Sequence, residues 1–263
     1  MRQVEVSYNG EPVVFDMNLK LDRGEVLGIV GESGSGKSTL AKAAMGLLGS
    51  EGSVTKGSIV FKGKALLDMP QESLRRLRGP HMGMIFQNCE SALCPLRTIG
   101  DQLFEALQEH GQRNRKDARE QALVMFKKMN LHDGNRILRS YPFELSGGMN
   151  QRVGIAMAMM FKPELLIADE PTSALDVISQ AKVVEEITSL REEYGISMVI
   201  ITHNIGLVYK IADKIAVMHQ GRLVEYGDAG AVINNPKEDY TQTLIQSVPR
   251  IRKGVRNDTC TGT

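Results

Sequence analysis

Between a short apolar run and a helix-forming stretch, the chain reads Gly31-Glu32-Ser33-Gly34-Ser35-Gly36-Lys37-Ser38-Thr39, which matches the P-loop pattern for binding phosphate. Residues Glu25 to Val30 before it read as a buried strand, and residues Thr39 to Leu48 after it read as a helix. The glycines let the loop wrap with its backbone N–H groups pointing inward, and the helix N-terminus adds partial positive charge. The stretch therefore predicts an α/β fold with a phosphate site at the end of a strand.

Two side chains of this loop have distinct expected roles. Lys37 should bridge the β- and γ-phosphates of a nucleotide, and the hydroxyl of Ser38 should hold Mg²⁺. The expected nucleotide contacts in the loop are Gly31, Ser33, Gly34, Ser35, Gly36, Lys37, Ser38 and Thr39. A glycine-rich turn can fit the pattern by chance, but here the strand, the helix, the lysine and the serine are all in place.

A second element ends in two acids. Leu165 to Ala168 reads as a strand buried on both faces, and Asp169 and Glu170 follow at its C-terminal end, where ligands bind in α/β sheets. Asp169 is expected in the Mg²⁺ shell, and Glu170 is expected to accept a proton from the attacking water or to orient it. The alternative, a strand that ends in acids for solubility, is weakened by the P-loop in the same chain.

Composition limits the class of protein. The 263 residues are 42% hydrophobic and 24% charged, as in an ordinary globular protein, and 32 Lys and Arg nearly balance 31 Asp and Glu. No global field would therefore draw the chain to nucleic acid or anionic lipid. Three cysteines suggest a reducing compartment without a disulfide framework. The longest apolar runs, Val153 to Phe161 and Ile196 to Ile201, are well short of the roughly 20 residues that cross a bilayer, so only a partner is expected to hold the chain at a membrane.

A third motif separates this chain from other P-loop proteins. Leu145-Ser146-Gly147-Gly148-Met149 with Gln151-Arg152 resembles the signature of ATP-binding-cassette (ABC) proteins. Further residues fit that family in order, namely Tyr8, Gln87, Ser173 to Asp176, and His203. Taken alone, Tyr8 could be a core tyrosine and His203 a structural histidine, and Gln87 by itself would not indicate a family or a function.

The resemblance implies a role for each of these residues. Tyr8 would stack on adenine, Gln87 would sense the γ-phosphate and reach Mg²⁺, and His203 would act as the switch histidine. Asp176 would belong to the D-loop. The signature residues Ser146, Gly147 and Gly148 would meet the nucleotide bound to a second subunit, so that two chains sandwich two ATP molecules. ATP and Mg²⁺ are the implied cofactors, and Glu170, His203 and Gln87 the implied catalytic residues.

The family also implies a fold and a domain plan. The fold is a P-loop NTPase (RecA-like) core with an antiparallel β subdomain and an inserted α-helical signature subdomain. We expect an ATPase domain over residues 1–250, with its core at 1–97 and 161–227, the helical subdomain at about 98–160 and a C-terminal extension at 228–250. Residues 251–263 are expected to form a flexible tail.

A subfamily is suggested by the signature, in which Met149 stands where Gln is usual. Together with Tyr141 to Glu144, Asp169 to Val177, and Asn235-Pro236 with Tyr240-Thr241, it resembles the ATPases of peptide, nickel and metal-chelate importers. Many oligopeptide members carry a cysteine-rich extension for an iron–sulfur cluster, which needs about four thiolates, and here only Cys260 lies beyond Pro249. The chain therefore resembles the shorter members, and Arg136 to Pro142 is closer to the nickel type.

This resemblance implies partners and a location. They are transmembrane permease subunits, a second ABC ATPase subunit (a related chain favoured over a second copy) and, indirectly, an extracytoplasmic solute-binding protein, with no nucleic acid. In the family a short helix of the permease sits in a groove near Asn88 to Arg97. The chain would lie on the cytoplasmic face of the inner membrane. The transported solute stays open, and so does one alternative function, a non-transport ABC ATPase that serves a soluble complex such as that of phosphonate breakdown.

Overall fold

A central sheet organises the protein, whose computed structural model describes residues 1–172 and 175–247. The six strands lie in the order β11-β10-β3-β9-β8-β7, and all pairs are parallel except β10 with β11. The strands are β3 (Val26–Val30), β7 (Met82–Ile85), β8 (Leu165–Asp169), β9 (Ser197–Thr202), β10 (Lys214–His219) and β11 (Arg222–Asp228). The parallel strands are short and almost wholly apolar because both of their faces are buried.

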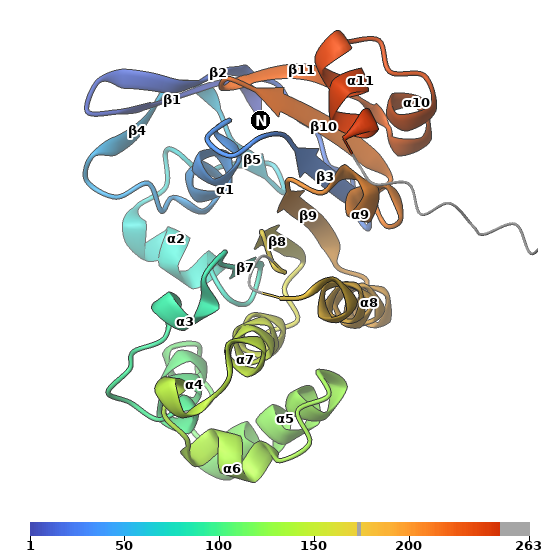
Figure 1. The fold of residues 1–263 in the computed structure, drawn as a ribbon. Coiled ribbons are helices and arrows are strands. Elements are labelled where there is room, and N and C mark those ends of the chain that lie inside the picture. The colour runs from blue at the N-terminus through green and yellow to red at the C-terminus, as the bar shows by residue number, and fades with distance from the viewer. Residues whose placement is uncertain (173–174, 248–263) are drawn as a thin grey trace, which may run out of the picture.

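A smaller antiparallel sheet covers one side of the central sheet (Figure 1). It has the order β2-β1-β4 and is made of β1 (Arg2–Tyr8), β2 (Glu11–Met17) and β4 (Gly52–Ser58). Helix α1 (Lys37–Met45) belongs to the same hydrophobic core, in which Leu40 is buried with Val6 of the small sheet and Ile29 of the large one. A two-stranded hairpin, β5 (Val60–Phe61) and β6 (Lys64–Ala65), and helix α2 (Gln71–Leu77) complete this side.

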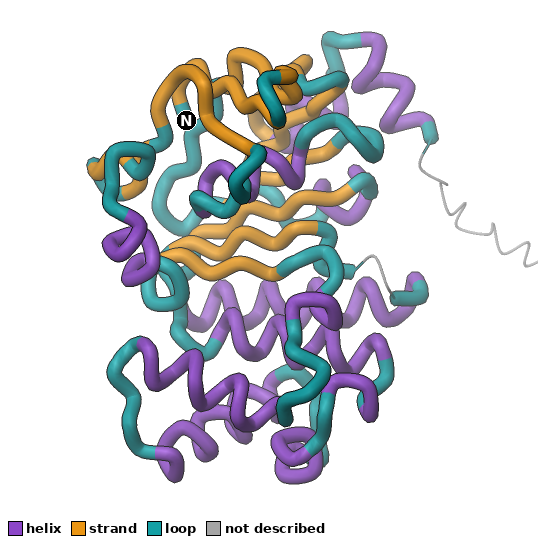
Figure 2. The backbone as a smooth tube through the Cα atoms, turned by 90° about the vertical axis from the view of Figure 1, so that its left-hand side faces the viewer, coloured by secondary structure: helices purple, strands orange, loops and turns teal. Residues whose placement is uncertain are grey.

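Most helices gather on the other side of the central sheet, as Figures 1 and 2 show. They are α3 (Cys89–Ala92), α4 (Ile99–Glu109), α5 (Arg115–Lys128), α6 (Gly134–Arg139), the 3₁₀ turn η1 (Pro142–Glu144), α7 (Gly147–Met159) and α8 (Val177–Tyr194). A second core joins them to the sheet, with Phe126 and Met159 buried beside Leu166 and Ile200. Helices α9 (Ile205–Tyr209), α10 (Ala229–Asn234) and α11 (Asp239–Gln246) follow near β10 and β11. None of the described helices combines the length and apolar character needed to cross a bilayer.

The strands predicted before the P-loop and before Asp169 are observed as β3 and β8, with two local differences elsewhere. The helix after the P-loop ends at Met45 rather than Leu48, because Gly46 takes a left-handed conformation (φ 63°) that caps it. Residues Ser58 to Phe61 are divided between the end of β4 and the separate β5, and the largely polar remainder of β4 was not predicted from the sequence. Its sequence, Gly52 to Ser58, is largely polar and exposed and carries little of the apolar alternation that marks a strand.

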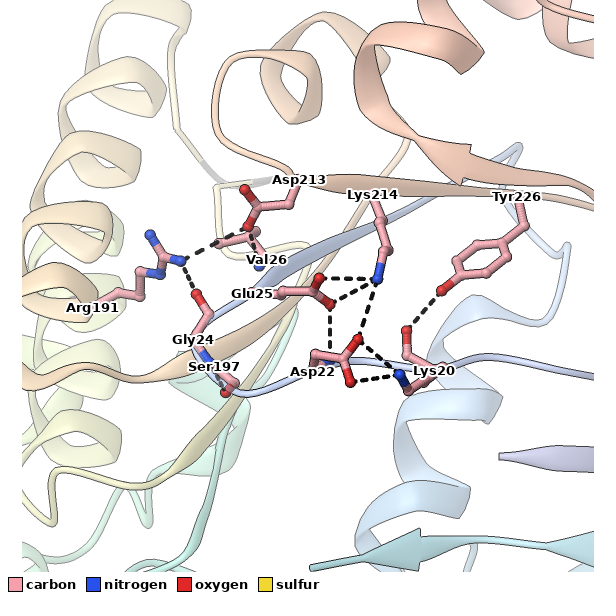
Figure 3. Close-up of polar contacts among 10 residues, drawn as sticks. All are labelled: Lys20, Asp22, Gly24, Glu25, Val26, Arg191, Ser197, Asp213, Lys214 and Tyr226. Carbon is pink, nitrogen blue, oxygen red and sulfur yellow. Dashed lines mark hydrogen bonds and ion pairs between the residues drawn. The ribbon is translucent and has the colours of Figure 1, made fainter.

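A polar network holds the amino-terminal ends of the parallel strands (Figure 3). The ammonium of Lys214 donates to the Glu25 carboxylate at 2.9 Å, and the Asp213 carboxylate accepts from the N–H of Val26 at 2.7 Å. The hydroxyl of Tyr226 donates to the carbonyl of Lys20 at 2.7 Å. A hydrogen bond from the Asp22 N–H and, after it, the Lys214 ammonium hold the pKa of Glu25 below its ordinary value. These contacts fix β3, β10 and β11 at the end of the sheet opposite the P-loop.

Candidate nucleotide site

The loop between β3 and α1 has the backbone that the glycine pattern predicts. Gly31 has a φ of 155°, and a Cβ added there would lie 2.1 Å from the carbonyl oxygen of Met218, so a side chain would displace the loop. Gly36 takes a φ of 93° at the N-cap of α1, in the left-handed region that favours glycine. The first turn of α1 therefore starts directly at Lys37, and its free N–H groups face the loop.

Lys37 is buried inside this loop. Its ammonium donates to the carbonyls of Gly31 at 2.8 Å and Glu32 at 2.7 Å. Burial lowers the pKa of Lys37, and the nearby Glu170 and Asp169 carboxylates oppose that shift. The side chain is thus a positioned cation at the centre of the loop, as contact with phosphate requires.

The change Lys37→Ala should lose most of the affinity for ATP, because the ammonium that meets the phosphates is removed and the loop carbonyls lose their donor. Titration calorimetry with ATP checks this. Lys42→Ala, which removes another lysine of α1 while leaving the loop contacts intact, is the matched control and should bind normally. Unchanged ATP binding by Lys37→Ala would exclude the role assigned to this loop.

The side-chain oxygens of Asp169, which is buried, and Ser38, which is half-buried, lie side by side. The Ser38 hydroxyl donates to the Asp169 carboxylate at 2.9 Å. Burial raises the pKa of Asp169, and the hydrogen bond from Ser38 opposes that rise. Within residues 1–172 and 175–247 no cluster of three His, Cys, Asp or Glu side chains forms a protein-only metal site. A hydroxyl and a carboxylate nonetheless fit Mg²⁺, which takes one or two protein oxygens together with waters and substrate phosphates.

Glu170 is held in one orientation by residues at the end of β9. Its carboxylate accepts from the His203 N–H at 3.0 Å, lies 2.9 Å from the Nδ1 of the same histidine, and accepts from the Thr202 hydroxyl at 3.3 Å. Glu170 also has a φ of 46°, which is uncommon for a residue other than glycine and costs energy. Glu170 is buried, whereas 66% of the His203 side chain is exposed. The arrangement presents one carboxylate, already oriented, next to the phosphate loop.

Lys37, Ser38 and Glu170 line a single cavity of about 680 Å³, whose described lining does not include Asp169 or Ser35. The described residues along it are Val13, Gly31, Glu32, Ser33, Gly34, Gly36, Lys37, Ser38, Thr39, Gln87, Glu170, His203 and Leu244. Sequence reasoning had named the P-loop residues, Gln87, Glu170 and His203. Three lining residues were not predicted as nucleotide contacts: Glu32 within the loop itself, and Val13 of β2 and Leu244 of α11, which come from distant places in the chain. Leu244 lies one helical turn after Tyr240, and Tyr240 is one of the residues on which the subfamily resemblance rests.

Other predicted residues lie outside the described lining of this cavity. Tyr8 stands on β1 with its ring beside Gly52, where an added Cβ would come within 2.7 Å of it, and its stacking on adenine stays a prediction. Ser146 caps α7 by accepting from the N–H of Met149 at 3.3 Å, and Ser146 and Gly147 are exposed. Asp176 accepts from the N–H of Ser179 at 3.1 Å. Ser173 and Ala174 of the predicted D-loop, residues 248–250 of the predicted extension and the expected tail at 251–263 lie outside the described residues.

Comparison with known proteins places these features in a family. The family described as "ABC transporter" matches residues 14–173, and the family described as "Oligopeptide/dipeptide transporter, C-terminal region" matches residues 224–262. The chain is 43% identical to the oligopeptide transport ATP-binding protein OppD of Salmonella typhimurium, over 90% of this chain and 71% of OppD. It is 42% identical to AmiE of Streptococcus pneumoniae, also an oligopeptide transport ATP-binding protein, over 89% of this chain and 66% of AmiE.

A solved structure shares the fold. The ATP-binding cassette MJ0796, in a dimeric post-hydrolysis state bound to ADP and phosphate, superimposes with a TM-score of 0.75. The two sequences are 29% identical, and the match covers 87% of this chain and 97% of that one. The mixed sheet described above is therefore a P-loop NTPase fold of the kind found in ATP-binding cassettes.

Proposed function

The chain belongs to the ABC transporter family, and we propose that it is the ATP-hydrolysing subunit that powers uptake of peptides through a permease. The observation that carries the nucleotide part is the shared cavity of Lys37, Ser38, Gln87, Glu170 and His203. The peptide part rests on the two named relatives and on the match at residues 224–262.

The proposed reaction assigns each residue a step. Backbone N–H groups of the loop and the Lys37 ammonium hold the phosphates of ATP. Glu170, oriented by His203 and Thr202, accepts a proton from the water that attacks the γ-phosphorus or holds that water in line. Gln87 and His203 line the cavity where a γ-phosphate would be sensed. Bound Mg²⁺, for which Ser38, Asp169 and Gln87 are the proposed ligands, would supply neutralising charge at the phosphate oxygens.

A second subunit completes the proposed site. Ser146, Gly147 and Gly148 stand at the exposed N-terminus of α7, outside the described lining of the chain's own cavity, so they are free to meet a nucleotide held by another chain. The dimeric state of the structural relative supports this arrangement. We favour a related ATPase chain as partner, as in a mixed pair, and Asp176 and Tyr8 as further nucleotide-site residues. The proposed division is a core at 1–97 and 161–227, a helical subdomain at about 98–160 and an extension at 228–250.

The permease is proposed to dock beside the loop from α3 to α4 and beside η1, which lies between α6 and α7. The large apolar side chains exposed here include Leu96, Tyr141 and Phe143. Leu96 is 84% exposed and Phe143 is 67% exposed, with the Phe143 ring stacked on Tyr141 at 5.5 Å. The N–H of Ile99 donates to the carbonyl of Ser140 at 2.9 Å, which brings the two segments together. Exposed apolar side chains gathered at one place mark interaction surfaces. Docking here would hold the chain at the cytoplasmic face of the membrane.

The change Leu96→Asp should release the chain from membranes while leaving ATP binding intact, because a charge replaces an apolar contact at the docking surface. Val124 of α5 is also exposed and apolar, so Val124→Asp is the matched control and should stay bound. The measurement is the fraction of protein that sediments with host membranes. Equal release of both variants would argue against this surface.

Uptake of labelled peptide and of nickel by a strain that lacks the gene tests which solute is transported. The proposal expects loss of labelled peptide uptake with unchanged nickel uptake, and recovery by the wild-type chain but not by Lys37→Ala. Loss of nickel uptake with intact peptide uptake would contradict the peptide assignment and favour the nickel reading that residues 136–142 suggested.

A further inference from the structure

The last described helix, α11, reaches the nucleotide site from the far end of the sequence. Figure 1 shows it beside β11, and its side chains Tyr240, Leu244 and Ile245 pack against the main core. Leu244 also lines the nucleotide cavity. The helix therefore forms part of the wall of a site whose recognised motifs all lie before residue 204.

Tyr240 connects this helix to the phosphate loop. Its hydroxyl accepts a hydrogen bond from the backbone N–H of Glu32 at 3.1 Å. Its ring lies 4.0 Å from the ring of His219, at the end of β10, with an angle of 37° between the ring planes. Burial raises the pKa of the Tyr240 hydroxyl. The ring is thus fixed by packing, and its hydroxyl is aimed at the second residue of the loop.

Glu32 carries this contact to the phosphate-binding lysine. The N–H of Glu32 donates to Tyr240, and the carbonyl of the same residue accepts from the Lys37 ammonium at 2.7 Å. The loop has a second contact with a distant segment, since the N–H of Gly221, in the turn between β10 and β11, donates to the carbonyl of Ser35 at 3.2 Å. A displacement of the Glu32 peptide would therefore move an acceptor of Lys37 as well.

We propose that Tyr240 is a positioning residue for ATP binding, which holds the Glu32 peptide so that the loop and Lys37 are set before the nucleotide arrives. It does not touch ATP in this account, and it acts through the loop. The inference rests on the proposed function, because it needs the cavity to bind ATP. Preorganisation of this kind lowers the cost of binding and leaves the chemical step alone.

The test is the change Tyr240→Phe, which keeps the ring on His219 and removes only the hydroxyl. The KM for ATP should rise about three- to tenfold, the effect of one hydrogen bond, with kcat nearly unchanged. Tyr226→Phe is the matched control, because it removes a tyrosine hydroxyl bonded to a backbone carbonyl at the opposite end of the sheet (Figure 3). Its KM should equal the wild-type value, and both variants should melt at similar temperatures.

Three results would overturn the proposal. They are a wild-type KM for Tyr240→Phe, a fall in kcat with an unchanged KM, and an equal rise in KM for Tyr226→Phe. Leu244→Ala gives a second, independent reading, because shortening this wall residue should raise the KM as well. A wild-type chain that binds no ATP would instead contradict the proposed function, so the two failures are distinguishable.

Discussion

Glu170→Gln should bind ATP normally and hydrolyse it about 10²- to 10⁴-fold more slowly than the wild type, the range for loss of a general base. The buried carboxylate is the acceptor that His203 and Thr202 hold beside the phosphate loop. An amide in its place keeps the shape and one acceptor oxygen but cannot take up a proton. ATP should therefore persist in the site. The purified variant, which has only copies of itself to pair with, should accumulate as a homodimer in size-exclusion chromatography with ATP.

Glu164→Gln is the control for this substitution. Glu164 lies just before β8, at its other end, and pairs there with Lys62 and His81 on the surface. The same chemical change at that end of the strand should leave turnover unaffected. Wild-type turnover by Glu170→Gln would show that another group activates the water.

Ser146→Arg should leave ATP binding by the single chain intact and abolish hydrolysis. Ser146 is exposed at the N-terminus of α7 and caps that helix, outside the described lining of the cavity. An arginine there would keep this signature from contacting the nucleotide of a second chain, while in a mixed dimer the two chains could still associate through the other, unaltered signature. Binding is checked by calorimetry and hydrolysis by phosphate release, with Ser50→Arg in an exposed loop as the control.

Mixing two inactive variants tests whether the signature acts in trans more directly than either variant alone. In a mixed dimer of Ser146→Arg and Glu170→Gln, one composite site keeps an intact Glu170 from one chain and an intact Ser146 from the other. That site should hydrolyse ATP, so activity should reappear on mixing. Continued inactivity in mixtures that do dimerise would contradict the action of the signature in trans.

Local sequence motifs were enough to predict most residues of the nucleotide site. The P-loop, Asp169 and Glu170 follow buried strands of a parallel sheet, so the topology alone brings them to one edge. Gln87 and His203 were found through family order and spacing, and the cavity includes both of them. The fold class followed from the same elements, because apolar strands alternating with helices favour a parallel α/β sheet.

Contacts between distant segments were not predictable from the sequence. Tyr240 and Glu32 lie 208 residues apart, and only the packing of α11 against the end of β10 brings them together. Strand β4 escaped notice because its residues are polar and it is stabilised by pairing with β1. The C-terminal end of α1 depends on the left-handed conformation of Gly46. Helix propensity alone does not predict that conformation.

A chain that drives a membrane permease should co-purify with it when a tagged form is isolated from detergent-solubilised membranes of its own host. We expect a pair of multi-span permease subunits in the purified material, with or without a second ABC ATPase. Leu96→Asp should lose these partners, and Val124→Asp should keep them. Recovery of a soluble enzyme complex without permease subunits would contradict the transport assignment and favour a cassette ATPase that serves enzymes such as those of phosphonate breakdown.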